Sequence, residues 1–166
     1  MSLQNITEKE VLEAQEKWAS GVIDIGKKFL AKQDYVSCAE IFLDSTYAFS
    51  MGDVLFKPTL ASETQFRLTK KAALSYFVAG DSDFKEDIGF ALLNWKTIRF
   101  ENKSIRIEGN IAMAMGNYFI TRDNVETKVE YSLVYKKDDQ GNLRIILHDS
   151  HLPYVRGAFQ VQINDR

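Results

Sequence analysis

The sequence is poor in cysteine, histidine and proline. Its single cysteine, Cys38, excludes an intrachain disulfide framework and a cysteine-rich zinc site. No apolar run approaches the ~20 residues that a membrane-spanning helix needs. The acidic, polar start of the chain also does not have the pattern of a signal peptide. We therefore expect a cytoplasmic protein with no membrane partner.

The sequence also lacks an excess of charge of either sign. Its 166 residues include 21 Lys and Arg against 23 Asp and Glu, a net charge of −2. Nucleic-acid-binding domains usually carry a clear basic excess, so we expect no nucleic-acid partner. Only Pro58 and Pro153 interrupt the chain, and no Ser/Gly/Pro-rich linker divides it. We therefore expect a single domain over residues 1–166, with a core that draws on 11 Phe, 7 Tyr and 2 Trp.

The first half of the chain has helical patterns. Thr7 and Glu10 form the S/T-x-x-E signature of a capping box, and apolar residues then recur at helical spacing as far as Leu30. A short helix is expected over 36–43. A hairpin is expected over 46–56, with its turn at Met51-Gly52-Asp53. Another helix is expected from Ser62, with Gln65 as capping partner, to Gly80.

From residue 92 onward the apolar pattern alternates, as it does in strands. Five strands are expected, over 92–101, 104–108, 111–121, 127–137 and 143–150. The short spacers between them favour antiparallel hairpins. Helices followed by strands are typical of an α+β fold, with the helices packed on one face of the sheet.

Both faces of the last strands carry apolar residues. In the strand from Ile111, Met113 and Phe119 lie on one face while Ala114 and Tyr118 lie on the other. A sheet that is apolar on both faces is typically covered on both. We therefore expect a homodimer that forms through the outer face of the sheet.

Several motifs together resemble a known family. The segment from Val54 to Leu60 (VLFKPTL), the strands around 105–120 and 131–138, and the ending His148-Asp149-Ser150-His151-Leu152-Pro153 resemble SnoaL-like proteins of the nuclear transport factor 2-like superfamily. The ending is similar to that of bacterial relatives of the calcium/calmodulin-dependent protein kinase II association domain. The resemblance covers about residues 8–155.

This resemblance implies a cone-shaped fold, in which a curved antiparallel sheet packs against a long N-terminal helix and two shorter helices. It also implies a ligand pocket inside the cone and pairing through the outer sheet face. The kinase association domain lines its pocket with arginines, whereas the corresponding positions here hold Asn117, Ser132 and Asp149. The resemblance therefore does not imply an acidic ligand bound in that mode.

Aromatic, thioether and a few polar side chains are the candidates for a pocket around a small, largely apolar ligand. The ligand-pocket candidates are Trp18, Tyr47, Arg67, Trp95, Met115, Asn117, Tyr118 and His148. Arg67 is expected on a helix, where it can point inward to a carboxylate or remain solvated. His148 can serve the pocket or form an ordinary strand-end hydrogen bond. No metal site and no cofactor are expected, because His148 and His151 lack further ligands at an established spacing.

Three functions remain open at this stage. The first is a small-molecule-binding domain, and the second is an acid/base isomerase, cyclase or dehydratase. The third is an oligomerisation module for a partner protein. Isomerases of the superfamily use a buried carboxylate with a tyrosine, for which Asp44 and Asp53 are the carboxylate candidates and Tyr47, Tyr118 and Tyr131 the hydroxyl candidates. The sequence assigns no catalytic residue and does not choose between enzyme and binding protein.

Overall fold

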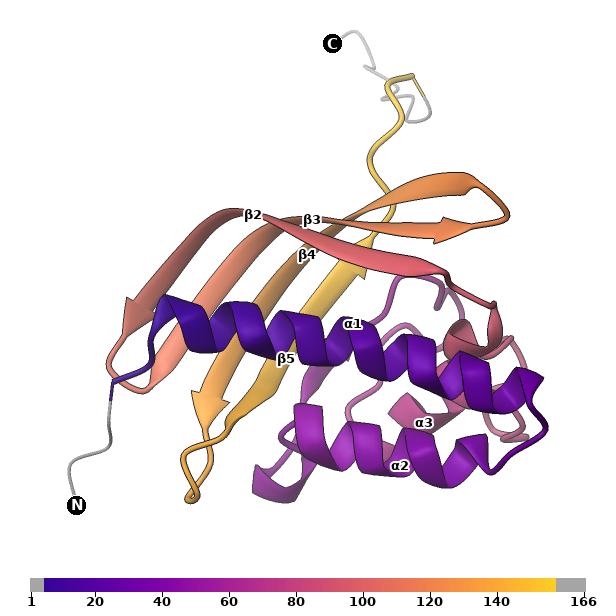
Figure 1. The fold of residues 1–166 in the computed structure, drawn as a ribbon, viewed down its shortest axis with the longest axis horizontal. Helices are drawn as coiled ribbons and strands as arrows, with labels where there is room; N and C mark the ends of the chain where they lie inside the picture. The colour runs from indigo at the N-terminus through magenta and orange to yellow at the C-terminus, as the bar shows by residue number, and fades with distance from the viewer. Residues whose placement is uncertain (1–4, 158–166) are drawn as a thin grey trace, which may run out of the picture.

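Three helices cover one face of a curved five-stranded sheet (Figure 1). The computed structural model describes residues 5–157, so both ends of the domain expected over 1–166 lie outside it. The elements are α1 (Glu8–Leu30), α2 (Tyr35–Thr46), β1 (Leu55–Lys57), α3 (Lys70–Val78), β2 (Thr97–Glu108), β3 (Ile111–Arg122), β4 (Val125–Lys137) and β5 (Leu143–His151), with short 3₁₀ turns at Phe49–Met51 and Phe90–Leu92. None of the helices in this range is long and apolar enough to cross a membrane.

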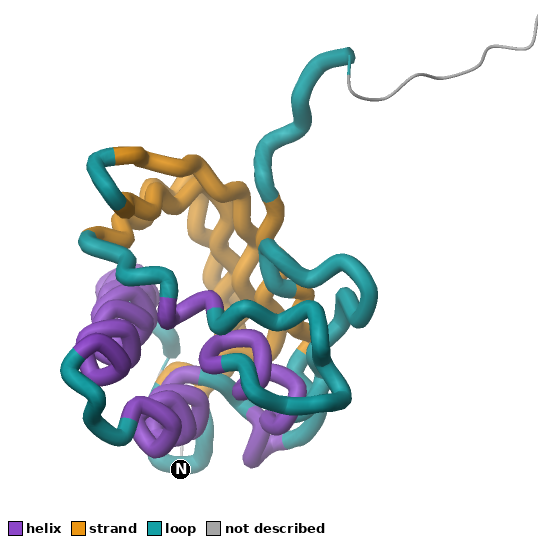
Figure 2. Tube along the Cα trace, turned by 90° about the vertical axis from the view of Figure 1, so that its right-hand side faces the viewer, coloured by secondary structure: helices purple, strands orange, loops and turns teal. Residues whose placement is uncertain are grey.

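The sheet has the order β1-β5-β4-β3-β2. The four long strands form antiparallel pairs, whereas β1 pairs in parallel with β5, so the sheet is mixed and open. Figure 2 shows the sheet bending over the helices. The α+β class and the curved sheet expected from the sequence are confirmed. The sheet is not wholly antiparallel as expected, because its edge strand β1 is parallel to β5.

The capping box at the start of α1 is present as predicted. The Thr7 side chain accepts a hydrogen bond from the Glu10 amide, and the Glu10 carboxylate accepts one from the Thr7 amide. From this start, Val11, Trp18 and Val22 recur on one face of the helix and are at most 3% exposed. The helix thus buries the apolar face that its spacing indicates.

The hairpin expected over 46–56 is wrong. Thr46 ends α2, residues 49–51 form a 3₁₀ turn, and the segment pairs with β5 instead of with itself. The Ala48 amide donates to the Ile145 carbonyl, and Phe56 lies beside His148 in the parallel register. Long-range pairing to β5 satisfies the backbone groups that a local turn would otherwise satisfy.

The helix expected from Ser62 is also wrong in its first two turns. The Ser62 amide and hydroxyl both donate to the carboxylate of Glu86, so neither takes part in a cap with Gln65. Residues 62–68 therefore remain irregular, and α3 begins at Lys70 behind the N-cap Thr69. A competing carboxylate from another segment overrides the local helix signal.

The two strands expected at 92–101 and 104–108 form one strand, β2, which begins at Thr97. The register against β3 shifts between Asn102 and Ser104, so the predicted turn is a β-bulge. Gly116 lies opposite this bulge, where a Cβ atom would lie 2.7 Å from the Lys103 backbone nitrogen. The bulge thus requires glycine at position 116 and allows Asn102 to point toward α1.

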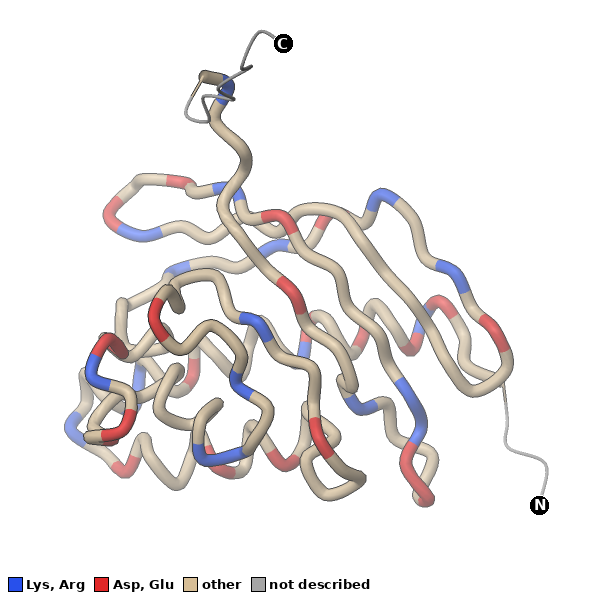
Figure 3. The backbone as a smooth tube through the Cα atoms, turned by 180° about the vertical axis from the view of Figure 1, so that it is seen from behind, with Lys and Arg blue, Asp and Glu red and all other residues tan. Residues whose placement is uncertain are grey.

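Charged residues of both signs interleave along the chain. Figure 3 shows Lys and Arg positions next to Asp and Glu positions on helices, strands and turns alike. Exposed pairs such as Lys9–Glu13 on α1 and Arg106–Glu108 on β2 follow this pattern. Such pairs contribute little to stability.

Candidate functional site

A row of hydrogen bonds crosses the aromatic core from α1 to β5. The indole Nε1 of Trp18 donates to the hydroxyl of Tyr47 at 2.9 Å, and that hydroxyl lies 2.9 Å from Nδ1 of His148. All three side chains are at most 3% exposed. Buried polar groups of this kind must be paired, and each pairing here joins a different element of the fold.

The row also determines where the proton of His148 lies. The Trp18 indole can only donate, so the Tyr47 oxygen accepts from it. Among the described residues, Nδ1 of His148 is the remaining partner of Tyr47, and it accepts the hydrogen bond that the phenol donates. In neutral His148 the ring proton is then on Nε2, which has no partner within residues 5–157. His148 thus presents an unused N–H donor.

Burial keeps this imidazole neutral. Desolvation lowers the pKa of His148 to about 3, and it also raises the pKa of Tyr47 well above its usual value. Neither side chain changes its charge near neutral pH. The row therefore offers a neutral donor and no ionised base.

Three hydroxyl groups meet beside this row. The Thr59 Oγ1 atom lies 3.1 Å from the hydroxyl of Tyr118 and 2.9 Å from Oγ of Ser150. Tyr118 and Ser150 are 1% and 2% exposed, and burial raises the pKa of Tyr118. Each hydroxyl can donate one hydrogen bond and accept another. Together the three neutral hydroxyls can pass protons to one another.

The strand geometry brings the imidazole and the hydroxyls together. His148 and Ser150 are two residues apart on β5, so both point toward the helices. Trp18 links the two groups, because its ring centroid lies 5.6 Å from that of His148 and 5.7 Å from that of Tyr118. Phe56 stacks on His148 at 5.1 Å. The polar atoms thus lie within an aromatic enclosure.

One cation contacts the backbone of β5. Lys57, the last residue of β1, lies beside Asp149 in the parallel register, on the outer face of the sheet, and donates from Nζ to the backbone carbonyl of Ser150 at 3.2 Å. It is half-buried, so water screens its charge less than on an open surface. Its charge therefore lies on the opposite face of β5 from the hydroxyl groups.

Four of the eight pocket candidates lie in this cluster: Trp18, Tyr47, Tyr118 and His148. Met115 and Asn117 lie on the opposite face of β3, and Met115 is 55% exposed there. Trp95 packs on Phe90 and donates to its carbonyl oxygen, outside the cluster.

The positions compared with the kinase arginines also lie on the outer face. Asn117 pairs with Glu130, and Ser132 pairs with Asp149. Neighbouring positions on each strand, such as Tyr118 and His148, point toward the helices instead. The three residues therefore do not line the helix-covered side of the sheet.

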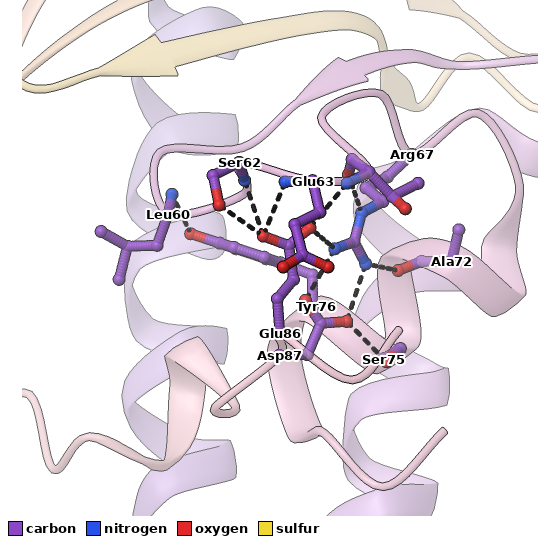
Figure 4. A network of polar contacts seen from close by, with 10 residues as sticks. Leu60, Ser62, Glu63, Arg67, Ala72, Ser75, Tyr76, Glu86 and Asp87 are labelled. Carbon is purple, nitrogen blue, oxygen red and sulfur yellow. Dashed lines mark hydrogen bonds and ion pairs between the residues drawn. The ribbon is translucent and has the colours of Figure 1, made fainter. Parts of the chain in front are cut away.

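Arg67 is buried in an ion-pair network away from the hydroxyl cluster (Figure 4). Its guanidinium donates to both carboxylate oxygens of Asp87 at 2.7 Å and approaches Glu86 at 3.4 Å. Ser75 of α3 donates to the same Asp87 carboxylate. Arg67 therefore meets carboxylates within the protein, from an irregular segment and not from a helix.

Glu86 fixes the loop that follows Thr59. Its carboxylate accepts hydrogen bonds from the backbone amides of Ser62, Glu63 and Thr64 (Figure 4), and these bonds lower its pKa to about 2. Nearby, the Leu60 amide donates to the Tyr76 hydroxyl. The segment that carries Thr59 is thus anchored at several backbone positions.

Thr59 and Ser150 were not predicted as site residues. Both lie in the motifs that carry the family resemblance, but a threonine or serine without a nearby base has no distinctive sequence signal. The alternation of side chains along β5 is a signal that could have indicated Ser150, because it places Ser150 on the same face as His148. The position of Thr59 depends on long-range pairing that the sequence does not show.

The carboxylates considered for isomerase chemistry lie outside the cluster. Asp44 is exposed and forms an ion pair with Lys70 at 2.7 Å, and Asp53 is exposed after the 3₁₀ turn. Within residues 5–157, no group of three His, Cys, Asp or Glu side chains is placed to hold a metal ion. The chemistry that the cluster offers is that of hydroxyls and a neutral imidazole.

Comparisons with known proteins agree on one family. The family model described as metal-independent carbonic anhydrase matches residues 9–152. A curated metal-independent carbonic anhydrase from Nostoc sp. is 45% identical over 153 residues, which cover 90% of this chain and 75% of the relative. A crystal structure of the iota-carbonic anhydrase from a cyanobacterium, complexed with bicarbonate, has a TM-score of 0.88 and 43% identity, covering 92% of this chain and 95% of that one.

A more distant structural neighbour supports the fold alone. An NTF-2-like protein of unknown function from Shewanella oneidensis has a TM-score of 0.54 and 12% identity, covering 86% of this chain and 97% of that one. The nuclear transport factor 2-like fold inferred from the sequence is therefore confirmed. The family matched by the comparisons is more specific than the SnoaL-like resemblance.

Burial of neutral His148 makes the stability of the protein depend on pH. Between about pH 6.5 and 3 the unfolded chain binds a proton at His148 and the folded chain does not, so stability falls as the pH falls. Urea unfolding at about pH 7.5 and 4.5 should therefore show a loss about 2–3 kcal/mol larger in the wild type than in His148→Gln. His151→Gln, which changes the half-exposed histidine, should keep the wild-type loss. An equal loss in wild type and His148→Gln would contradict a buried neutral His148.

Removal of Arg67 should be strongly destabilising. Arg67→Met leaves the 2%-exposed Asp87 carboxylate without its cation, at an expected cost of about 3–5 kcal/mol in the free energy of unfolding. Lys70→Met, which breaks the exposed pair with Asp44, should cost less than about 1 kcal/mol. Urea denaturation of both variants makes the comparison, and similar costs would argue against a tightly coupled buried pair.

Proposed function

Because the chain belongs to the family of metal-independent carbonic anhydrases, we propose that it interconverts carbon dioxide and bicarbonate. The proposed site consists of the Thr59, Tyr118 and Ser150 hydroxyls and the Nε2–H group of His148. The observation that carries this assignment is the meeting of three hydroxyls beside an unpartnered buried N–H donor. In this proposal, the small-molecule ligand expected from the sequence is carbon dioxide and its hydrated form.

The aromatic enclosure suits carbon dioxide, which is small and apolar. The hydroxyls suit the water that attacks it and the oxygens of bicarbonate, since each hydroxyl both donates and accepts. One site can thus bind both the apolar and the charged partner of the reaction.

We propose a concerted proton relay for the hydration step. The oxygen of water forms a bond to the carbon of CO2 while one C=O π bond opens. A water proton passes to a site hydroxyl, and the proton of that hydroxyl passes to an oxygen of CO2. The product is H2CO3, which ionises to bicarbonate and a proton, and the hydroxyl is unchanged.

The two buried side-chain types have distinct parts in this step. The hydroxyls position water against carbon dioxide, which removes the entropy cost of bringing them together. The His148 N–H donates to the oxygen on which negative charge develops. With a pKa of about 3 and its Nδ1 atom occupied by Tyr47, His148 is not the general base.

Loss of the hydroxyls should reduce the hydration rate. Stopped-flow hydration with a pH indicator should give a kcat about 10²-fold lower for Ser150→Ala and Thr59→Val, since each removes a positioning donor and a relay group. Ser132→Ala, on the outer face of the neighbouring strand, should keep the wild-type kcat. Addition of a chelator should also leave the rate unchanged. A wild-type protein that does not accelerate hydration would refute the proposed function.

We further propose that the protein is a homodimer that pairs through the outer face of the sheet. Met115 is 55% exposed there and lines a shallow cleft of about 230 Å³ with Met113, Ala114, Ser104 and Arg106. Exposed thioether side chains in such a cleft are typical of a protein interface.

Sedimentation velocity at micromolar concentration should show a dimer for the wild type and a monomer for Met115→Glu. Ile41→Glu, which places the same charge on an exposed apolar position of α2, should remain dimeric. A monomeric wild-type protein would refute the dimer proposal.

A further inference from the structure

A cleft of about 280 Å³ opens between α1 and β2, on the side of the sheet that the helices cover. Its wall from α1 includes Leu12, Gln15 and Ala19, and its wall from β2 includes Ile98, Phe100 and Asn102. Half of the lining residues are apolar, and the other half are the polar and charged residues Gln15, Asn102, Glu16 and Arg99. The cleft therefore has walls suited to both an apolar gas and a polar solute.

Phe100 separates this cleft from the proposed site. Its side chain lines the cleft, and its ring centroid lies 5.9 Å from that of Trp18 and 5.3 Å from that of Tyr118. Trp18 in turn contacts His148, and Tyr118 contributes a hydroxyl to the cluster. The barrier between cleft and site is thus one aromatic ring.

The neighbours of Phe100 hold the rest of the wall in place. Gln15 and Asn102 donate to each other's side-chain oxygens at 2.8 and 2.7 Å, and the Tyr131 hydroxyl donates to Asn102. These bonds tie α1 to β2 beside Phe100. The phenyl ring of Phe100 has no polar group and is held by packing.

Two other clefts among the described residues do not reach the site in this way. The cleft beside α2 and α3 and the cleft beside the β3–β4 turn include Tyr35 and Trp95, respectively. Tyr35 packs edge-to-face against Phe29, and Trp95 packs against Phe90 at a tilted angle. Neither ring contacts a member of the hydroxyl and imidazole cluster.

We propose that the cleft between α1 and β2 is the route by which carbon dioxide and bicarbonate reach the site, and that the Phe100 ring is its gate. This inference rests on the proposed function for the identity of the solutes. Rotation of one side chain would open the route without separating α1 from the sheet. The size of the opening at Phe100 then sets which small solutes enter.

The gate has a readout that does not depend on catalysis. The chain has two tryptophans, so in a Trp95→Phe background the fluorescence reports on Trp18 alone, directly behind Phe100. In this background Phe100→Ala should raise the quenching constant for acrylamide severalfold. Phe29→Ala, which removes a ring of α1 that packs edge-to-face against Tyr35, should leave quenching unchanged. Unchanged quenching in Phe100→Ala would overturn the gate.

The route is tested by blocking the cleft in the folded protein. In a Cys38→Ser background, Leu12→Cys places a thiol at the 43%-exposed cleft position, and Glu13→Cys places one on the neighbouring, exposed position of α1. Labelling with N-phenylmaleimide should lower kcat/KM for CO2 severalfold in Leu12→Cys and leave it unchanged in Glu13→Cys. Labelled Leu12→Cys that keeps its unlabelled kcat/KM would overturn the route.

The two experiments distinguish a failure of the proposed route from a failure of the proposed function. An inactive wild-type protein would refute carbonic anhydrase activity, and the quenching of Trp18 would then decide alone whether Phe100 closes the cleft. An active wild-type protein with no effect of labelling would keep the function and place the entrance elsewhere, such as beside the half-buried Thr59.

Discussion

Trp18, Tyr47 and His148 come from α1, the end of α2 and β5, and their hydrogen bonds connect three elements that are distant in sequence. Each of these polar groups is buried, so each bond prevents a desolvation cost that the core would otherwise carry. The same bonds fix the tautomer of His148 and point its Nε2–H away from the row. The fold and the chemistry of the site thus depend on one buried arrangement.

Much of the fold could be predicted because its signals are local. The Thr7–Glu10 capping box and the alternation from residue 97 onward depend on residues close in the chain, and both appear in the structure. The hairpin over 46–56 and the helix from Ser62 failed for the opposite reason. In these two segments the backbone groups form hydrogen bonds with β5 and with Glu86, which are distant in sequence, and not with the nearby residues that the local pattern indicates.

The site was less predictable than the fold. Aromatic residues and a rare histidine attract attention, and Trp18, Tyr118 and His148 do lie together. Thr59 and Ser150 carry ordinary hydroxyls. They matter because their hydroxyl oxygens lie 2.9 Å apart, and the residue types alone do not indicate a site. A site made from neutral groups has no charge pattern or ligand spacing that could be recognised in the sequence.

The bulge at Asn102–Ser104 has an evolutionary consequence. Side chains alternate along β2, and the extra residue at the bulge lets Phe100 and Asn102 face α1 while Ile105 and Ile107 still face the core. A deletion of one residue there would restore regular alternation with the same side chains on each face, but it would remove the bulge that brings the Lys103 backbone against Gly116. Homologous chains should therefore either keep this length together with a glycine at the position of Gly116 or lose both, so that the bulge and the glycine are inherited as a pair.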